Sequence, residues 1–137
     1  MYQKIAVPVD LAHVDRLPRA LQTAADLSRH YDAPVTFVSV TAETPTSVAH
    51  SPGEFEAKLA AFAQEQSQKH AISADARSYT STDPAIDTDR ILRRAIDELG
   101  ADLVVMASHI PGVADYLWAG HGATVAAHST ASVFLVR

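Results

Sequence analysis

The chain has 137 residues, of which 47% are hydrophobic and 20% charged, and it carries a formal net charge of −5. This length suits one domain with a sizeable core, so we expect a single domain over residues 1–137, with a composition unlike that of a disordered chain. The acidic balance without a basic stripe argues against nucleic acid as a partner, and the absence of cysteine excludes disulfides and thiolate metal sites.

The N-terminal third of the chain predicts a strand, a helix and a second strand. Residues 4–9, KIAVPV, and residues 34–40, PVTFVSV, are continuous apolar runs, which are typical of strands buried on both faces of a parallel sheet. Between them, apolar side chains recur at helical spacing over residues 14–31, with Pro18 near the start, where a missing N–H costs little. Residues 41–50, TAETPTSVAH, are predicted to form a surface loop.

The middle of the chain predicts two helices on either side of a polar strand. Residues 51–54, SPGE, are typical of a helix N-terminus, with a capping box and a proline at the first helical position. An apolar stripe within residues 91–99 marks the buried face of the next helix, and Gly100 is placed to end it. Residues 73–80 lie between these helices and are more polar than the other strand candidates, so we expect an edge strand there.

The last third predicts strands at residues 103–107, LVVMA, and 132–136, SVFLV, with a short helix over residues 120–129. Strands and helices therefore alternate along the whole chain. This order implies an α/β fold, a doubly wound five-stranded parallel sheet with helices on both faces, which is Rossmann-like. In such sheets, ligands bind beyond the carboxyl ends of the strands, where the strand order reverses.

Two segments bring candidate ligand residues to that edge of the sheet. Pro8, Val9 and Asp10 end the first strand, and the Asp10 carboxylate is suited to accept hydrogen bonds from a ribose or a base. The alternative for Asp10 is a loop or N-cap aspartate, which is the more frequent role of this residue type in turns. Val40 ends the second strand, where its main-chain groups can contact an adenine edge; the alternative is a core valine.

The third segment, residues 106–125, MASHIPGVADYLWAGHGATV, connects the fourth strand to the last helix and holds three of the five glycines. Its candidate ligand residues are Met106, Ala107, Ser108, His109, Ala119, Gly120 and His121. Main-chain N–H groups and the helix dipole favour an anion at the start of that helix; the alternative is a loop that binds nothing. Tyr116 and Trp118 either cover a bound base, pack on a partner, or anchor the loop in the core.

Three segments of this chain resemble the universal stress protein family: KIAVPVD at the start, ADLVVMASH late in the chain, and the closing AGHGATVAAHSTASVFLVR. The resemblance covers essentially the whole chain and is strongest to the short F- and G-type members. Those members carry Ala-Ser-His after the fourth strand, a proline two residues later and a Leu-Leu-Gly-Ser-Asn turn. Residues 107–109, Pro111 and residues 117–121 stand in the same frame here. The resemblance implies ATP binding, as in many members, and a homodimer paired through the last strand.

The phosphate motif of ATP-binding family members, Gly-x2-Gly-x9-Gly-(Ser/Thr), is altered in this chain. Aligned on the turn, its glycines fall at Ala107, Ile110 and Ala119, the last one residue early. The hydroxyl residue of the motif becomes Gly120, so we expect weak or no phosphate binding and expect Gly120→Ser to restore a donor. The residues on the base and ribose side stand where the family has them: Pro8, Asp10 and Val40.

The sequence supports three classes of function. The first is a stress-response module that binds ATP or another adenine nucleotide, and the alternative is a nucleotide-free dimeric interaction or scaffold protein. The third is a slow ATP hydrolase, but the chain has no evident general base near the phosphates and no Walker lysine, so we predict no enzyme activity and no catalytic residue. An apolar edge strand at the end of the chain favours a homodimer.

Metal, membrane and secretion are each unsupported by the sequence. His109, His121 and His128 offer three imidazoles for zinc, but no carboxylate is evidently placed to complete a site, so no metal is predicted. The apolar runs are far shorter than the ~18 residues of a membrane span. The first ten residues lack the long apolar region and cleavage site of a secretory signal, so we expect a cytoplasmic protein with no membrane partner.

Overall fold

The computed structural model describes residues 1–107 and 109–137. Its strands are β1 (Ile5–Pro8), β2 (Val35–Ala42), β3 (Ala74–Ser81), β4 (Leu103–Ala107) and β5 (Ser132–Val136). They form one sheet in the order β3-β2-β1-β4-β5, and every neighbouring pair is parallel. The chain first builds outward from β1 to β3 and then returns to add β4 and β5, so the strand order reverses between β1 and β4. The predicted doubly wound sheet is confirmed.

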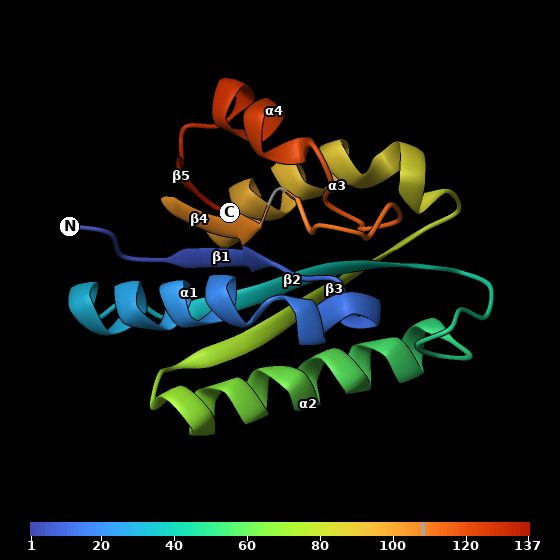
Figure 1. Cartoon of the computed structure of the whole chain (residues 1–137), viewed down its shortest axis with the longest axis horizontal. Coiled ribbons are helices and arrows are strands. Elements are labelled where there is room, and N and C mark those ends of the chain that lie inside the picture. Colours follow the sequence, from blue (N-terminus) through green and yellow to red (C-terminus); the bar gives the residue numbers. More distant parts are fainter. Residues whose placement is uncertain (108) are drawn as a thin grey trace.

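Two helices cover each face of the sheet (Figure 1). Helices α1 (Pro18–Tyr31) and α2 (Pro52–His70) lie on one side, and α3 (Pro84–Leu99) and α4 (His121–His128) lie on the other. All residues of β1 and β4 are buried, because these strands have helices on both faces and a strand on both edges. The apolar stripe of α3, including Ile91, Leu92 and Ile96, faces this core as predicted.

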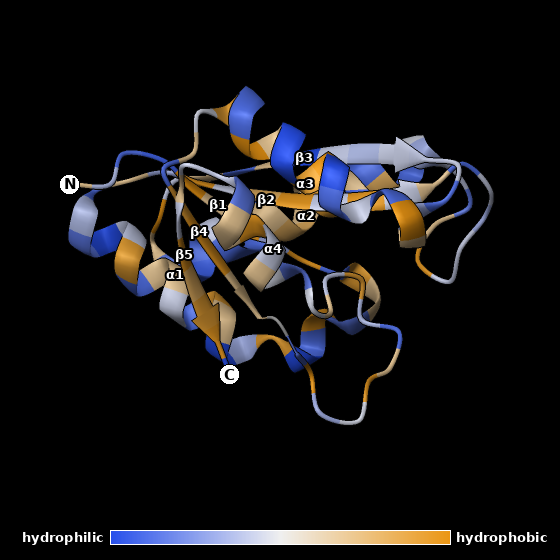
Figure 2. Cartoon of the chain, turned by 90° about the horizontal axis from the view of Figure 1, so that it is seen from above, coloured by the Kyte–Doolittle hydropathy of each residue, from blue (hydrophilic) through white to orange (hydrophobic). Residues whose placement is uncertain are grey.

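The two edges of the sheet differ in hydropathy (Figure 2). Strand β3 is pale at one edge, in agreement with the predicted polar edge strand, whereas β5 is strongly hydrophobic at the other. Phe134 and Leu135 of β5 are 45% and 40% exposed. Among the described residues, none of the helices combines the length and the apolar character needed to span a membrane.

The helix expected over residues 14–31 is divided into two parts. A 3-10 helix, η1 (Leu11–Arg16), precedes α1, and the Asp10 side chain accepts a hydrogen bond from the Ala12 N–H at its start. Leu17, between the two helices, has φ −112° and ψ 19°. Because Pro18 has no N–H to donate and disfavours helical geometry in the residue before it, a continuous helix over residues 14–31 cannot form.

Two sequence signals at helix ends are confirmed, one at the start of α2 and one at the end of α3. Ser51 Oγ accepts a hydrogen bond from the Glu54 N–H at 3.1 Å, as in a capping box, while the Glu54 carboxylate reaches back to the His50 N–H at 3.0 Å. Gly100 ends α3 with φ +65°, a conformation that glycine adopts without a steric penalty. These local signals fix where α2 begins and where α3 ends.

The surface loop expected over residues 41–50 is shorter and more ordered than predicted. Strand β2 extends to Ala42, and the Thr46 N–H donates to the Ala49 carbonyl at 2.8 Å to close a turn. Ala49 is buried, so this turn packs its far end onto the core. It thereby forms one wall above the carboxyl end of β2.

Candidate functional site

Asp10 lies just beyond the carboxyl end of β1 and is largely buried. Its Oδ1 accepts from the Ala12 N–H at 3.1 Å, and its Oδ2 accepts from the Leu117 N–H at 3.0 Å. The carboxylate therefore caps η1 and ties down a loop more than a hundred residues away in sequence. Each carboxylate oxygen has two lone pairs, so capacity for a further donor remains.

Trp118 anchors the connection between β4 and α4 to the edge of the sheet. Its indole Nε1–H donates to the Val9 carbonyl at 2.9 Å, and the side chain is fully buried. Tyr116 is also buried, and its hydroxyl has no partner among the described residues. Burial and the nearby charge of Asp10 raise the pKa of Tyr116 well above its usual range. Of the three roles considered for these aromatics, anchoring in the core is the observed one.

A cleft opens at the carboxyl edge of the sheet between these elements. A cavity of about 190 Å³ is lined by Asp10, Val40, the turn after β2 and Leu117. It shares Pro84, Asp115 and Leu117 with a neighbouring cavity of about 520 Å³, which continues to Ala119 and His121. The cleft thus brings predicted residues from the first, second and fourth strands to one place.

The entrance to this cleft carries acidic side chains. Asp115 Oδ1 lies 3.1 Å from His13 Nε2, and the Asp115 side chain is 86% exposed. Asp83, which precedes α3, lines the 520 Å³ cavity. Carboxylates at this position repel an anionic ligand group, whereas a neutral sugar or base is unaffected by them.

Gly120 is the N-cap residue of α4 and adopts a left-handed conformation, with φ +76° and ψ 0°. Nine residues separate it from Ile110, which is the spacing of the second and third glycines in the family's phosphate motif. Gly120 rather than Ala119 therefore occupies the third glycine position, which corrects the alignment made on the turn. The hydroxyl position of the motif then falls on His121.

His121 is held by two residues of α3 that are adjacent in sequence. Its Nε2 lies 3.0 Å from Thr88 Oγ1, and its Nδ1 is hydrogen-bonded to Asp89 Oδ1. Thr88 is almost completely buried, so His121 is the partner that satisfies its hydroxyl. The first turn of α4 thus presents an imidazole and a neighbouring carboxylate where ATP-binding family members have a small hydroxyl residue.

Gly122 lies where α4 packs on β5. A Cβ at this position would lie 2.2 Å from Leu135 Cδ2. The glycine therefore allows the Leu135 side chain to pack closely against the helix, and a larger residue here would require that side chain to move. It lies within α4, not in the loop that precedes the helix.

The other sequence-predicted site residues divide between core and surface. Pro8, Val9, Met106 and Ala107 are buried in or beside the central strands, so only their main-chain groups can face a ligand. Ile110 is also buried, so its branched side chain packs inward, not across an open loop. His109 is exposed, and Ser108 lies outside the described residues.

The three histidines weighed as zinc ligands do not form a common site. His109 lines a cavity beside α1, whereas His121 is engaged by α3. In residues 1–107 and 109–137, no group of three His, Asp or Glu side chains is arranged to hold a metal ion.

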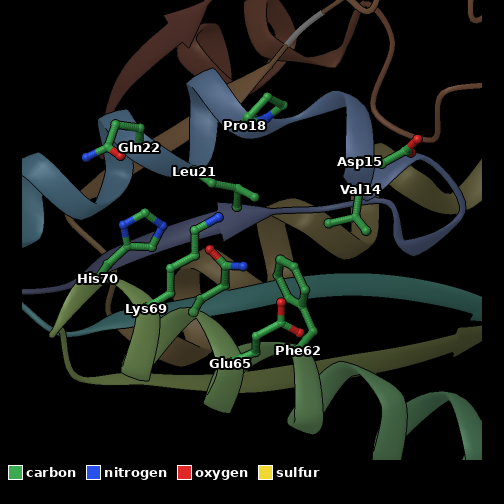
Figure 3. Close-up of a pocket in the computed structure, with 10 residues that line it drawn as sticks. Val14, Asp15, Pro18, Leu21, Gln22, Phe62, Glu65, Lys69 and His70 are labelled. Carbon is green, nitrogen blue, oxygen red and sulfur yellow. The ribbon is translucent and has the colours of Figure 1, made fainter.

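A further cavity, of about 360 Å³, lies between α1 and α2, away from the cleft (Figure 3). Leu21 and Phe62 face each other across it, with Lys69 and His70 toward one end and Asp15 toward the other. The amide oxygen of Gln66, a buried residue in its lining, has no partner among the described residues. No residue predicted as a ligand contact from the sequence lines this groove.

The model of the universal stress protein family matches residues 1–137, the entire chain. The chain belongs to the universal stress protein family. The family resemblance stated from the sequence motifs is therefore confirmed.

Solved structures of universal stress proteins share the fold. A family protein from Burkholderia pseudomallei has 20% sequence identity and a TM-score of 0.68, with 98% of this chain and 96% of that chain covered. The Archaeoglobus fulgidus protein in complex with dAMP has 19% identity and a TM-score of 0.67, with 99% and 98% covered. An Arabidopsis thaliana family protein with AMP bound has 17% identity and a TM-score of 0.63, with 98% and 90% covered. At these identities the likeness establishes the fold.

Several residues of the site were not found from the sequence. Thr88 and Asp89 lie on α3, 33 and 32 residues before His121, and no motif spacing connects them. The contact between His13 and Asp115 joins segments that only the sheet topology brings together. The sequence did offer the aromatic pair Tyr116 and Trp118, for which anchoring the loop in the core was one of three possible roles. It did not show which residues they would contact.

Proposed function

We propose that this universal stress protein binds the adenosine part of an adenine nucleotide in the cleft at the carboxyl edge of β1 and β2. The observation that carries the proposal is the continuous lining from Val40 and Asp10 to Ala119 and His121. In this arrangement the base lies against the end of β2 and the ribose lies near Asp10. The bound dAMP and AMP of the two family structures support an adenine nucleotide as the ligand class.

Phosphate groups beyond the first contribute little to affinity in this proposal. A phosphate at the start of α4 would gain about 0.3–1 kcal/mol from the helix dipole. Asp89 is hydrogen-bonded to His121, so its carboxylate also lies beside the start of α4. Asp83 and Asp115 line the cavity that leads to this helix end. ATP should therefore bind at most about tenfold more tightly than adenosine or AMP, a difference of roughly 1.4 kcal/mol.

The proposal includes the biological role that the family suggests: a cytoplasmic protein of the stress response that signals its occupancy to partners and catalyses no reaction. It also includes a homodimer paired through β5. The support for pairing is the apolar character of this edge strand, which otherwise presents unpaired main-chain groups and the side chains of Phe134 and Leu135 to solvent.

Mass spectrometry of small molecules released from the denatured protein tests which nucleotide is carried. Calorimetry with adenosine, AMP and ATP then tests the site, using Asp10→Asn and, as a matched control, Asp97→Asn on the exposed face of α3. We expect Asp10→Asn to weaken all three ligands by about tenfold, since a hydrogen bond to a charged group contributes roughly 1.5–3 kcal/mol. Equal affinity in wild type and Asp10→Asn would contradict the placement of the ribose.

The alternative function is a nucleotide-free dimeric scaffold. It is favoured by one specific observation: both oxygens of Asp10 already accept main-chain hydrogen bonds in a cavity of only about 190 Å³. Sites for drug-sized ligands are usually about 300–1,000 Å³. Failure to detect any nucleotide affinity at millimolar concentration, with the dimer retained, would establish this alternative.

A further inference from the structure

A separate cavity of about 240 Å³ lies between the start of α1 and the carboxyl ends of β4 and β5. Its apolar floor includes Leu17, Ile110 and Val136, all nearly buried. Three arginine side chains, Arg16, Arg19 and Arg137, stand around it. We call this cavity, with these six residues, the arginine pocket. In Figure 2, the end of β5 runs toward the start of α1 at this place.

The arginines around this pocket form no ion pair with an Asp or Glu side chain in the part of the chain that the structure describes. The chain has eight arginines, and four of them form ion pairs: Arg29, Arg77, Arg90 and Arg94. Of the remaining four, which have no ion pair among the described residues, three surround this one cavity. No aspartate or glutamate is among its lining residues. Three arginines thus gather around one cavity in a chain whose net charge is −5.

Two of these arginines are held in place by main-chain acceptors. Arg16 Nη2 donates to the Pro111 carbonyl at 2.9 Å, and Arg19 Nη1 donates to the Arg137 main-chain oxygen at 3.3 Å. Each guanidinium has five N–H donors, so most remain available to a ligand. The restraint lowers the conformational entropy lost when an anion binds, which favours affinity.

The start of α1 adds to the same potential. Its N-cap, Leu17, supplies no side-chain hydrogen bond, and Pro18 has no N–H. The positive end of this 14-residue helix therefore lies against the pocket without a capping carboxylate or hydroxyl.

We propose that the arginine pocket binds a small amphiphilic organic anion, with its charged head at the arginines and an aliphatic or aromatic body on the apolar floor. A hydrated inorganic anion would leave the apolar floor uncovered, and a neutral hydrocarbon would leave the arginines without a partner. We therefore expect both to bind more weakly than an amphiphilic anion. The volume limits the body to a short chain or a single ring. This site lies outside the adenosine cleft, because neither Asp10 nor Val40 lines it. Ala107 and His109, which the sequence analysis lists among the candidate ligand residues, also line this pocket.

The test is an NMR titration of the labelled full chain with octanoate, 1-octanol and sulfate, each followed by amide chemical shifts. We expect octanoate to saturate at millimolar concentration and to shift the amides of Arg19, Ala20 and Ile110. At equal concentration, 1-octanol and sulfate should bind at least fivefold more weakly. Added sodium chloride should weaken octanoate, because the arginines are at an exposed rim.

Arg16→Gln and Arg19→Gln should each weaken octanoate by about threefold to fivefold, in keeping with exposed ion pairs. The matched control is Arg93→Gln, which should leave affinity unchanged; Arg93 is an exposed arginine of α3 for which the described residues provide no ion pair. Octanol binding as tightly as octanoate, shifts confined to other residues, or equal loss in Arg93→Gln would each overturn the proposal.

Discussion

Replacing His121 by serine places a hydroxyl at the first residue of α4, directly after Gly120. This change restores the Gly-Ser pair of the family's phosphate motif at the position that the structure indicates. Gly120→Ser, which the turn alignment suggested, is a poorer choice, because Gly120 has φ +76°. A left-handed conformation costs a residue with a side chain roughly 1–2 kcal/mol.

The structural cost of His121→Ser follows from the contacts of the imidazole. The variant loses the hydrogen bonds to Thr88 Oγ1 and Asp89 Oδ1 and leaves the buried Thr88 hydroxyl without its partner. An unsatisfied buried polar group costs about 1–3 kcal/mol, so we expect the free energy of unfolding to fall by about 2–3 kcal/mol in total. Denaturant titration followed by far-UV circular dichroism measures this loss.

The gain should appear in the preference for ATP. Asp89 would keep its negative charge beside the new hydroxyl, so the full effect needs the double variant His121→Ser with Asp89→Asn. A hydrogen bond to a phosphate contributes roughly 1.5–3 kcal/mol, and we expect the ratio of ATP to adenosine affinity to rise by about tenfold or more. Calorimetry with both ligands measures the ratio, and Asp89→Asn alone is the matched control, with a smaller rise. A folded double variant with an unchanged ratio would refute the assignment of the α4 N-terminus as the phosphate end.

Three further predictions concern the loop anchors and the sheet edge. Trp118→Phe removes the indole hydrogen bond to the Val9 carbonyl and leaves a void, so the free energy of unfolding should fall by about 2 kcal/mol in denaturant titration. The Ser39 hydroxyl still donates to that carbonyl, so a loss above about 5 kcal/mol would contradict this account. Tyr116→Phe removes a buried hydroxyl without a partner and should leave stability unchanged or higher by about 1 kcal/mol. Because burial and Asp10 raise the pKa of Tyr116 above its ordinary value of 10.0, the wild type should lose stability as pH rises beyond that value, where the unfolded chain ionises. Thermal melts should show a smaller alkaline loss in Tyr116→Phe, and equal losses would exclude this tyrosine as the cause. Phe134→Glu places a charge on the exposed face of β5 and should convert a dimer to the 14.7 kDa monomer in sedimentation. The control is Ile86→Glu, at an exposed position of α3, which should leave the dimer intact. A dimer that survives Phe134→Glu would place the interface elsewhere.

The sequence determined most of the fold because its signals are local. Continuous apolar runs marked the buried strands, and the predicted bounds of β4 and β5 agree with the observed ones. The capping box at Ser51 and the glycine at 100 act through neighbouring main-chain groups, so they can be read without any tertiary information. The exception, the helix over residues 14–31, failed where Pro18 acts on the residue before it.

The family resemblance predicted which segments meet at the carboxyl edge of the sheet, but it did not predict the contacts between them. Asp10 comes just after the first strand, and in a doubly wound sheet ligands bind beyond the carboxyl ends of the strands, so its position near a ligand cleft was predictable. That its second oxygen would hold the Leu117 N–H was not, since the partner lies 107 residues away. Likewise, the partners of Trp118 and His121, on either side of Gly120, lie far away in the sequence and could not be predicted.

Only the tertiary structure decided which residues face each other across the sheet edge. By itself, the sequence determined a five-stranded parallel sheet and a candidate cleft at its carboxyl edge. Only in the folded chain do Thr88 and Asp89 form hydrogen bonds to His121 at the start of α4. In the same way, folding brings Arg16, Arg19 and Arg137 around one apolar pocket. The physical reason is that strand order sets such distances: β4 and β5 pair at one side of β1, and this pairing brings the start of α1, the segment after β4 and the end of β5 together.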